Sequence, residues 1–238
     1  MSKKRLVLTL VFLVWPVGAV VAQTRPGNEA ATMLIARGNR SFAKQDYHAA
    51  LREYESVPTS AGESYTQALY NIGVSYYELW RTADAIDFYR RAIQARNGHY
   101  PRASYALGVA LEDQGQLAQA KEAYQQSIIG SRGEYSVAYY RLGLLLASEG
   151  EYTTAAEFFR NALKHPGLHV AASHNNLGVM LAQMGSLKAA QHEFEKALNQ
   201  SGGNFEDAAR NLKLCRSLLS ADSSKQVAVF KVFEVKQH

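Results

Sequence analysis

Apolar residues along most of this chain follow the spacing of amphipathic helices, and small and aromatic residues recur within that pattern every 35 residues. Glycine occupies the same place in five such stretches, at Gly38, Gly73, Gly108, Gly143 and Gly178. Glycine inside a helix costs about 1 kcal/mol relative to alanine, so five copies at one spacing indicate a shared packing requirement. A repeat of this length predicts a solenoid made of copies of one supersecondary unit.

Three further positions keep the same register. The twelfth residue after each glycine is alanine (Ala50, Ala85, Ala120, Ala155, Ala190), and the sixteenth is aromatic (Tyr54, Tyr89, Tyr124, Phe159, Phe194). The nineteenth is small (Val57, Ala92, Ser127, Ala162, Ala197). The pattern predicts two antiparallel helices per unit, whose backbones approach closely at the glycine and alanine. We expect the ring to fill the space where one helix pair meets the next.

The five repeated glycines are called the framework glycines from here on. A turn residue is recognisable inside each unit, seven residues after its framework glycine. Gly115, Gly150 and Gly185 stand there in the last three units, as suits a left-handed helix terminus. Gln45 and Trp80 replace glycine in the first two units, and we expect those turns to be less regular. Two interpretations of Trp80 are open: its ring covers its own turn, or it is an exposed anchor for a partner.

These positions resemble the tetratricopeptide repeat family, whose pattern has a small residue at the eighth position, alanine at the twentieth and an aromatic at the twenty-fourth. The resemblance implies an all-α fold, a right-handed α-solenoid with a concave groove lined by the first helix of each unit. It also implies a protein or peptide partner. Five units fit, at residues 31–64, 66–99, 101–134, 136–169 and 171–203.

The C-terminal residues differ in composition from the repeats. Residues 204–220 predict a helix that caps the solenoid, with an apolar side formed by Ala208, Ala209, Leu212, Cys215, Leu218 and Leu219. Residues 221–238 follow, and 227–236 are rich in β-branched and aromatic residues. Three interpretations of this tail are open: a strand docked on its own groove, a strand offered to a partner's sheet, and a flexible tail. Self-assembly into a homo-oligomer through this end is an alternative function.

Residues 1–22 have the features of a secretory signal peptide. Lys3, Lys4 and Arg5 precede an apolar stretch at residues 6–21, and Ala22 offers a small residue for cleavage. The stretch is shorter than the roughly 20 residues of a spanning helix and contains Pro16. We predict export to a bacterial periplasm or to the exterior. An uncleaved anchor is the alternative, and it would be the chain's membrane contact.

Charge and cysteine content narrow the function classes. Cleavage after residue 22 would remove three positive charges from the formal +5 and leave +2, so no basic surface for nucleic acid is expected. Cys215 is the one cysteine of the 238 residues, which excludes a disulfide within the chain. It is either a buried small apolar residue or a reactive thiol.

Candidate chemistry is sparse. The sequence contains no nucleophile elbow, phosphate-binding loop, dinucleotide motif or paired-cysteine metal signature, so we predict no enzyme and no cofactor. His165, His169 and His174 are close in sequence, but Pro166 and Gly167 keep the first two off a common helix face. We interpret them as polar linker residues, with a metal site as the alternative. A regulatory subunit of an enzyme is a further alternative function.

A groove-lining set follows from the repeat register. Tyrosine offers a large apolar contact with a polar tip, and asparagine can pair with both backbone groups of a peptide. The candidate binding residues are Tyr70, Tyr105, Tyr140, Asn39, Asn71, Arg102, Arg141, Asn175 and Asn176. For the three tyrosines, generic filling of the framework is the alternative to peptide contact.

Some members of the family grip a C-terminal carboxylate with basic residues and asparagines on successive first helices. Asn39, Asn71 and Arg102 match such places, but Ile35 and Ala106 stand where that pattern needs basic residues. We therefore do not carry that specificity over.

Overall fold

The computed structural model describes residues 26–165, 167, 169–220 and 232. The predicted signal peptide lies outside these residues, as does the tail except for Val232, which packs against the C-terminal core cluster. The described residues form eleven α-helices and a short 3-10 turn at Thr59–Ala61. The helices are α1 (Pro26–Ala43), α2 (Tyr47–Glu55), α3 (Glu63–Glu78), α4 (Thr82–Ala95), α5 (Pro101–Asp113), α6 (Leu117–Gly130), α7 (Ser136–Ser148), α8 (Tyr152–Lys164), α9 (Val170–Gln183), α10 (Leu187–Gln200) and α11 (Glu206–Ser220).

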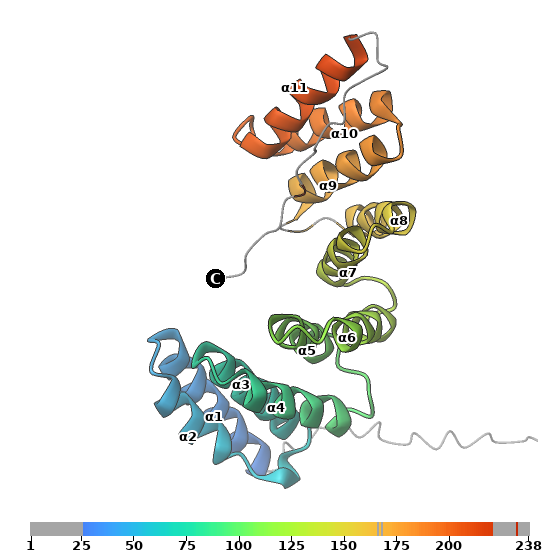
Figure 1. Cartoon of the computed structure of the whole chain (residues 1–238). Coiled ribbons are helices and arrows are strands. Elements are labelled where there is room, and N and C mark those ends of the chain that lie inside the picture. Colours follow the sequence, from blue (N-terminus) through green and yellow to red (C-terminus); the bar gives the residue numbers. More distant parts are fainter. Residues whose placement is uncertain (1–25, 166, 168, 221–231, 233–238) are drawn as a thin grey trace, which may run out of the picture.

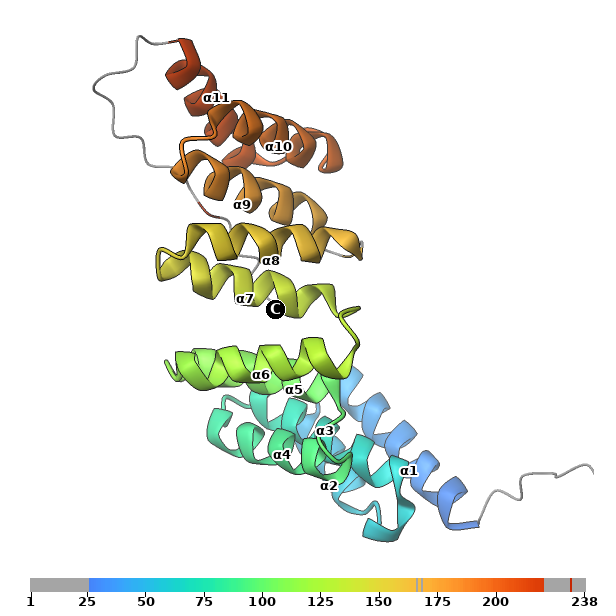
Figure 2. The same cartoon turned by 90° about the vertical axis from the view of Figure 1, so that its right-hand side faces the viewer.

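The first ten helices form five hairpins that stack in chain order, and α11 closes the C-terminal end (Figures 1 and 2). The predicted all-α solenoid is therefore confirmed. Each hairpin corresponds to one predicted unit, although α1 begins at Pro26, ahead of the expected start at Ala31. Each helix packs mainly against its neighbours in the chain, which is the organisation of a repeat protein.

The framework glycines are explained by the aromatic ring of the same hairpin. A methyl group placed on Gly108 would lie 2.5 Å from Cε1 of Tyr124, and one on Gly178 would lie 2.6 Å from Cε1 of Phe194. All five glycines have such a contact with the ring sixteen residues later, at 2.3–2.9 Å. The ring thus fills the interior of its own hairpin, whereas the sequence pattern placed it between successive hairpins. That expectation was wrong about which gap the ring fills.

Burial follows the repeat register closely. The five alanines twelve residues after the glycines are 0% exposed, and the five rings are at most 2% exposed. Burying a ring contributes about 1.5–3 kcal/mol by area, which exceeds the helix-propensity loss of about 1 kcal/mol at glycine. The repeated glycine is therefore favourable overall, because it makes room for the ring.

All five turns within the hairpins have one geometry. Gln45 (φ 61°) and Trp80 (φ 60°) adopt the same left-handed conformation as Gly115 (φ 72°). In each of these three turns the next amide N–H donates to the carbonyl five residues back, over 2.9–3.0 Å. This hydrogen bond fixes the helix terminus whichever residue carries the strain. The expectation of less regular turns at Gln45 and Trp80 was therefore wrong.

The Trp80 ring does not cover its turn, because the residue is 92% exposed. Of the two interpretations of Trp80, the exposed position is the one that the structure shows. Its backbone is held in a conformation that side chains disfavour by roughly 1–2 kcal/mol.

Helix α11 buries Ala208, Leu212, Cys215 and Leu218 against the last hairpin. Ala209 and Leu219, predicted on the same side, are exposed instead. The buried face includes Asn211 instead, which is 1% exposed. The Asn211 Nδ2 donates to Oδ1 of Asn175 over 2.9 Å, so an amide pair occupies a place that apolar patterning cannot predict.

Cys215 is fully buried in this interface, and its Sγ donates to the Leu187 carbonyl over 3.1 Å. Burial raises the pKa of the thiol. These features fit the interpretation of a buried small residue rather than a reactive one.

We predict that Gly178→Ala destabilises the protein by about 1–3 kcal/mol, although alanine is the better helix former, because the new methyl group displaces the Phe194 ring. In a Phe194→Ala background the same change should be neutral or stabilising by up to about 1 kcal/mol. Urea unfolding followed by circular dichroism measures both effects. A penalty that persists without the ring would contradict this explanation.

We predict that Trp80→Gly stabilises the protein by about 0.5–1 kcal/mol, because relief of left-handed strain exceeds the entropy that glycine adds to the unfolded chain. Gly115→Trp is the matched reverse change and should destabilise by a similar amount. Midpoints of urea unfolding measure the two shifts, and shifts of the same sign would refute the argument.

Candidate functional site

A pocket of about 310 Å³ lies on the inner face of the second and third hairpins. Helices α3 and α5 supply most of its wall. The lining residues are Tyr70, Val74, Tyr77 and Glu78 from α3, Tyr89 from α4, Arg102, Tyr105, Ala106 and Val109 from α5, and Tyr135, which precedes α7. We call this hollow the inner pocket.

Helical spacing brings these side chains together. Tyr70, Val74 and Tyr77 are separated by four and three residues and so share one face of α3. Arg102, Tyr105 and Val109 share one face of α5 in the same way. The two faces meet because successive hairpins stack with their first helices adjacent.

The three tyrosines of the candidate binding set, Tyr70, Tyr105 and Tyr140, are here called the ladder, and each is held between two aromatic rings. Tyr70 contacts Tyr89 and Tyr100, with ring centroids 5.9 and 5.6 Å away. Tyr105 contacts Tyr124 and Tyr135 at 5.7 and 5.5 Å. The ladder rings are therefore fixed in place before any ligand arrives.

The third ladder residue, Tyr140, repeats this arrangement at a deeper level. It contacts Phe159 at 5.9 Å and stacks on His169 at 4.8 Å. Burial and the nearby charge of Arg141 lower the pKa of His169, so the stacked imidazole is neutral at pH 7. Tyr140 is only 1% exposed, and Phe159 and His169 enclose its ring.

Three other predicted groove residues are also interior. Arg141, Asn175 and Asn176 are all buried. Asn175 donates to Asn176 over 3.1 Å, and Asn176 donates to the Tyr140 hydroxyl over 3.4 Å. These amides connect the fourth and fifth hairpins and the cap, so we assign them to the framework and not to a peptide-binding surface.

Arg141 forms an ion pair with Glu112 over 3.8 Å, across the boundary between the third and fourth hairpins. Burial disfavours its charged form, but Tyr105, Tyr124 and Glu112 outweigh burial and raise the pKa of Arg141. The Tyr124 hydroxyl also donates to Glu112 over 2.6 Å. This cluster holds neighbouring hairpins together.

Of the predicted set at the second and third hairpins, Tyr70, Asn71 and Arg102 are at least partly exposed, whereas Tyr105 is buried at 8% exposure. Arg102 lies over the Tyr70 ring, 6.0 Å from its centroid. Both residues also border a neighbouring hollow of about 600 Å³, which includes Asn71 and Gln67. Asn71 donates to Asn39 over 3.1 Å, and Asn39 also accepts from Tyr54 over 2.7 Å, so Asn39 joins α1 to both α2 and α3.

The inner pocket is electrically asymmetric. Arg102 stands near the start of α5, whereas Glu78 ends α3 and Asp113 ends α5. The Tyr77 hydroxyl donates to the Asp113 carboxylate. Because the first helices run in the same direction, the pocket has a cationic end and an acidic end. Burial raises the pKa of Tyr70 to about 12, so its phenol stays neutral between them at pH 7.

Sequence reasoning missed Tyr77, Tyr100 and Tyr135. A signal for the last two was present, because both stand eight residues before a framework glycine. Their rings pack on the ladder residue of the preceding hairpin, a relation that becomes visible only when the stacking is known.

A sequence profile described as tetratricopeptide repeat matches residues 29–100, 105–169 and 140–204. The chain belongs to the tetratricopeptide repeat family. None of the curated proteins matches it.

Solved tetratricopeptide repeat structures have the same fold. A crystal structure of MamA protein is similar with a TM-score of 0.60 and 26% identity, over 76% of this chain and 95% of that one. MamA from residue 41 onward, from Desulfovibrio magneticus RS-1, gives 0.60 and 20%, over 74% and 97%. YrrB, described as a TPR protein with an unusual peptide-binding site, gives 0.60 and 22%, over 79% and 100%.

Among the described residues, no group of three or more histidine, cysteine or acidic side chains is placed to hold a metal ion. His174 instead pairs with Glu193 over 2.7 Å. Within the same residues, no helix combines the length and apolar character needed to span a membrane.

Proposed function

We propose that this protein is an exported tetratricopeptide repeat scaffold that binds an extended segment of a partner protein in the inner pocket, as part of a cell-envelope assembly. The observation that carries the proposal is the inner pocket itself: the partly exposed rings of Tyr70 and Tyr77, held by their neighbours, lie in a hollow that Arg102 and Glu78 also line.

The fixed rings favour binding for a thermodynamic reason. A ligand that meets an ordered surface does not have to offset the entropy of ordering it. Tyr70 and Tyr105 are each held by two ring contacts, and Tyr77 by its bond to Asp113. The scaffold can therefore bind without rearranging.

The chemistry of the pocket defines the segment that would fit. Val74, Ala106 and Val109 together with the tyrosine rings accommodate an apolar side chain. Arg102 favours an acidic group on one side of that side chain, and Glu78 favours a basic group on the other. Asn71 and Gln67, in the adjoining hollow, can pair with the backbone of the segment as it leaves.

The export part of the proposal rests on residues 1–22, with their basic start and short apolar run. An exported scaffold would meet its partner in the periplasm or at the envelope. The low formal charge after cleavage agrees with a protein partner rather than nucleic acid.

We predict that peptides selected on the wild-type protein from a random library carry an acidic residue beside an apolar one, and that Arg102→Glu weakens them at least tenfold. The loss follows from replacing attraction by repulsion at the cationic end of the pocket. Titration calorimetry measures the dissociation constants. Peptides in which the acidic residue is changed to lysine should regain affinity for the Arg102→Glu protein.

Arg160→Glu on α8 is the matched control, because Arg160 is exposed and lies in a different hairpin. It should leave every dissociation constant unchanged. Equal weakening by both charge reversals, or selected peptides indifferent to Arg102→Glu, would rule out the inner pocket as the binding surface.

We predict that the chain expressed in a bacterium with a periplasm is recovered from that compartment with Gln23 as its first residue. Leu13→Arg interrupts the apolar run and should retain the uncleaved chain in the cytoplasm. Cell fractionation shows in which compartment the protein lies, and its intact mass shows whether residues 1–22 have been removed. Recovery of the wild-type chain from the cytoplasm with residues 1–22 still attached would contradict export.

A further inference from the structure

The third hairpin differs from the others at one pair of facing positions. These are the residue four before the framework glycine and the residue fifteen after it. The second hairpin has Leu69 and Phe88 there, the fourth has Tyr139 and Phe158, and the fifth has His174 and Glu193. The third has only Ser104 and Ala123.

In the second, fourth and fifth hairpins these large side chains fill space between the two helices. Leu69 and Phe88 belong to one apolar cluster, and the Tyr139 and Phe158 rings lie 5.9 Å apart. His174 bonds to Glu193 over 2.7 Å. The third hairpin therefore lacks the volume of two large side chains at a place where its neighbours are filled.

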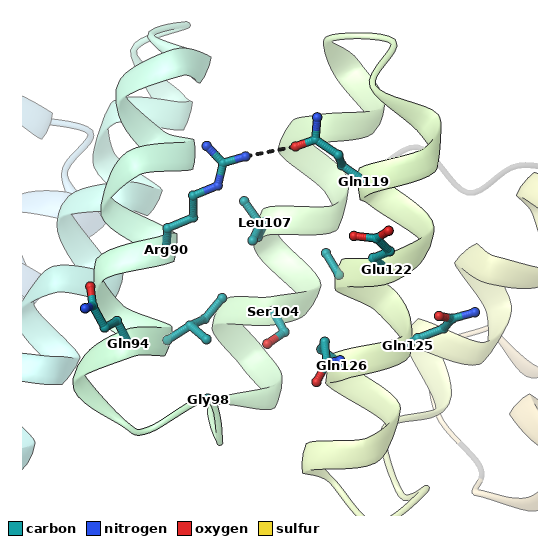
Figure 3. Close-up of a pocket in the computed structure, with 11 residues that line it drawn as sticks. Arg90, Gln94, Gly98, Ser104, Leu107, Gln119, Glu122, Gln125 and Gln126 are labelled. Carbon is teal, nitrogen blue, oxygen red and sulfur yellow. Dashed lines mark hydrogen bonds between the residues drawn. The ribbon is translucent and has the colours of Figure 1, made fainter.

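A hollow of about 540 Å³ occupies that place, and we call it the outer socket. Figure 3 shows it between α4, α5 and α6, with the Arg90–Gln119 hydrogen bond of 3.0 Å across one side and Gly98 at the other. Ser104 and Ala123 line its interior.

The hydroxyl of Ser104 gives the outer socket a specific chemical requirement. Ser104 is 1% exposed, and its Oγ has no hydrogen-bond partner among the described residues. Serine in a helix can bond to the carbonyl four residues back, as Ser75 does to Asn71 over 2.9 Å, but Ser104 does not make this bond. A buried hydroxyl without a partner is unfavourable, so a ligand that supplies a polar atom there gains affinity.

The remaining walls indicate the rest of the ligand. Leu107 and Ala123 are apolar, which suits a hydrocarbon ring. Gln94 and Gln126 lie at the rim, and their amides can pair with peptide N–H and C=O groups. The fourth hairpin shows that a tyrosine ring fits the equivalent place, because Tyr139 occupies it.

We propose that the outer socket is a second binding site, which takes a tyrosine side chain from an extended segment of a partner protein. The ring replaces the missing pair of side chains, the phenol pairs with Ser104, and the glutamines hold the flanking backbone. This site is separate from the inner pocket. Ser104 and Leu107 line one side of α5, whereas Arg102, Tyr105 and Val109 line the other.

The probe is N-acetyl-tyrosinamide, titrated into the full chain and followed by amide NMR shifts. Shifts confined to α4, α5 and α6 are expected. N-acetyl-phenylalaninamide should bind about fivefold more weakly, since it lacks the phenol that pairs with Ser104. Free p-cresol should also bind more weakly, because it has no backbone for the glutamines.

Two variants test the site itself. Ser104→Tyr combined with Ala123→Phe copies the fourth hairpin, and it should abolish binding while raising Tm. Ser104→Ala keeps the volume and removes the hydroxyl, so tyrosine affinity should fall to that of phenylalanine. The single change decides the question if the double variant does not fold. Arg102→Glu should leave binding unchanged, which separates this site from the inner pocket.

Tyrosinamide binding that survives filling of the socket would overturn the proposal. Equal affinity for the tyrosine and phenylalanine amides would overturn the role of Ser104. Equal affinity for p-cresol and the tyrosine amide would overturn a polypeptide as the ligand.

Discussion

In every hairpin an aromatic ring of the second helix occupies the space that a side chain on the first helix would need. Contacts of 2.3–2.9 Å to a hypothetical methyl group leave no alternative to glycine at those five places while the rings stay where they are. The alanine four residues before each ring lies at 0% exposure and completes the close approach. Once the hairpins have this shape, stacking them side by side produces the concave face and the inner pocket.

The ladder tyrosines serve both the framework and the proposed binding surface, in proportions that change along the array. Tyr70 is partly open and beneath Arg102, whereas Tyr140 is enclosed by Phe159 and His169. The same register thus gives a partly exposed ring in the second hairpin and buried rings in the third and fourth. Repetition preserves the backbone, while the neighbours of each ring decide whether a ligand can reach it.

The sequence predicted the architecture well because the repeat register is set by local packing, which periodicity reports directly. The sequence could not predict which polar side chains are buried. The sequence pattern placed three polar residues in the groove, but the structure buries all of them: Asn175, Asn176 and Arg141. Gln45 and Trp80 were misjudged because a backbone hydrogen bond, not the side chain, fixes their turns. The outer socket arises from missing volume at Ser104 and Ala123, and an absence of bulk becomes meaningful only when facing positions are known to meet.

The amide chain from Asn176 through Asn175 to Asn211 has a consequence for how the array could change in length. The residues equivalent to Asn175 and Asn176 in the preceding unit are Tyr140 and Arg141. An in-frame deletion of the fifth unit would bring α11 against a ring and a guanidinium, and Asn211 would lose its amide partner. The cap is therefore matched to one particular neighbour, so gene rearrangements that remove that unit would require a compensating change in the cap.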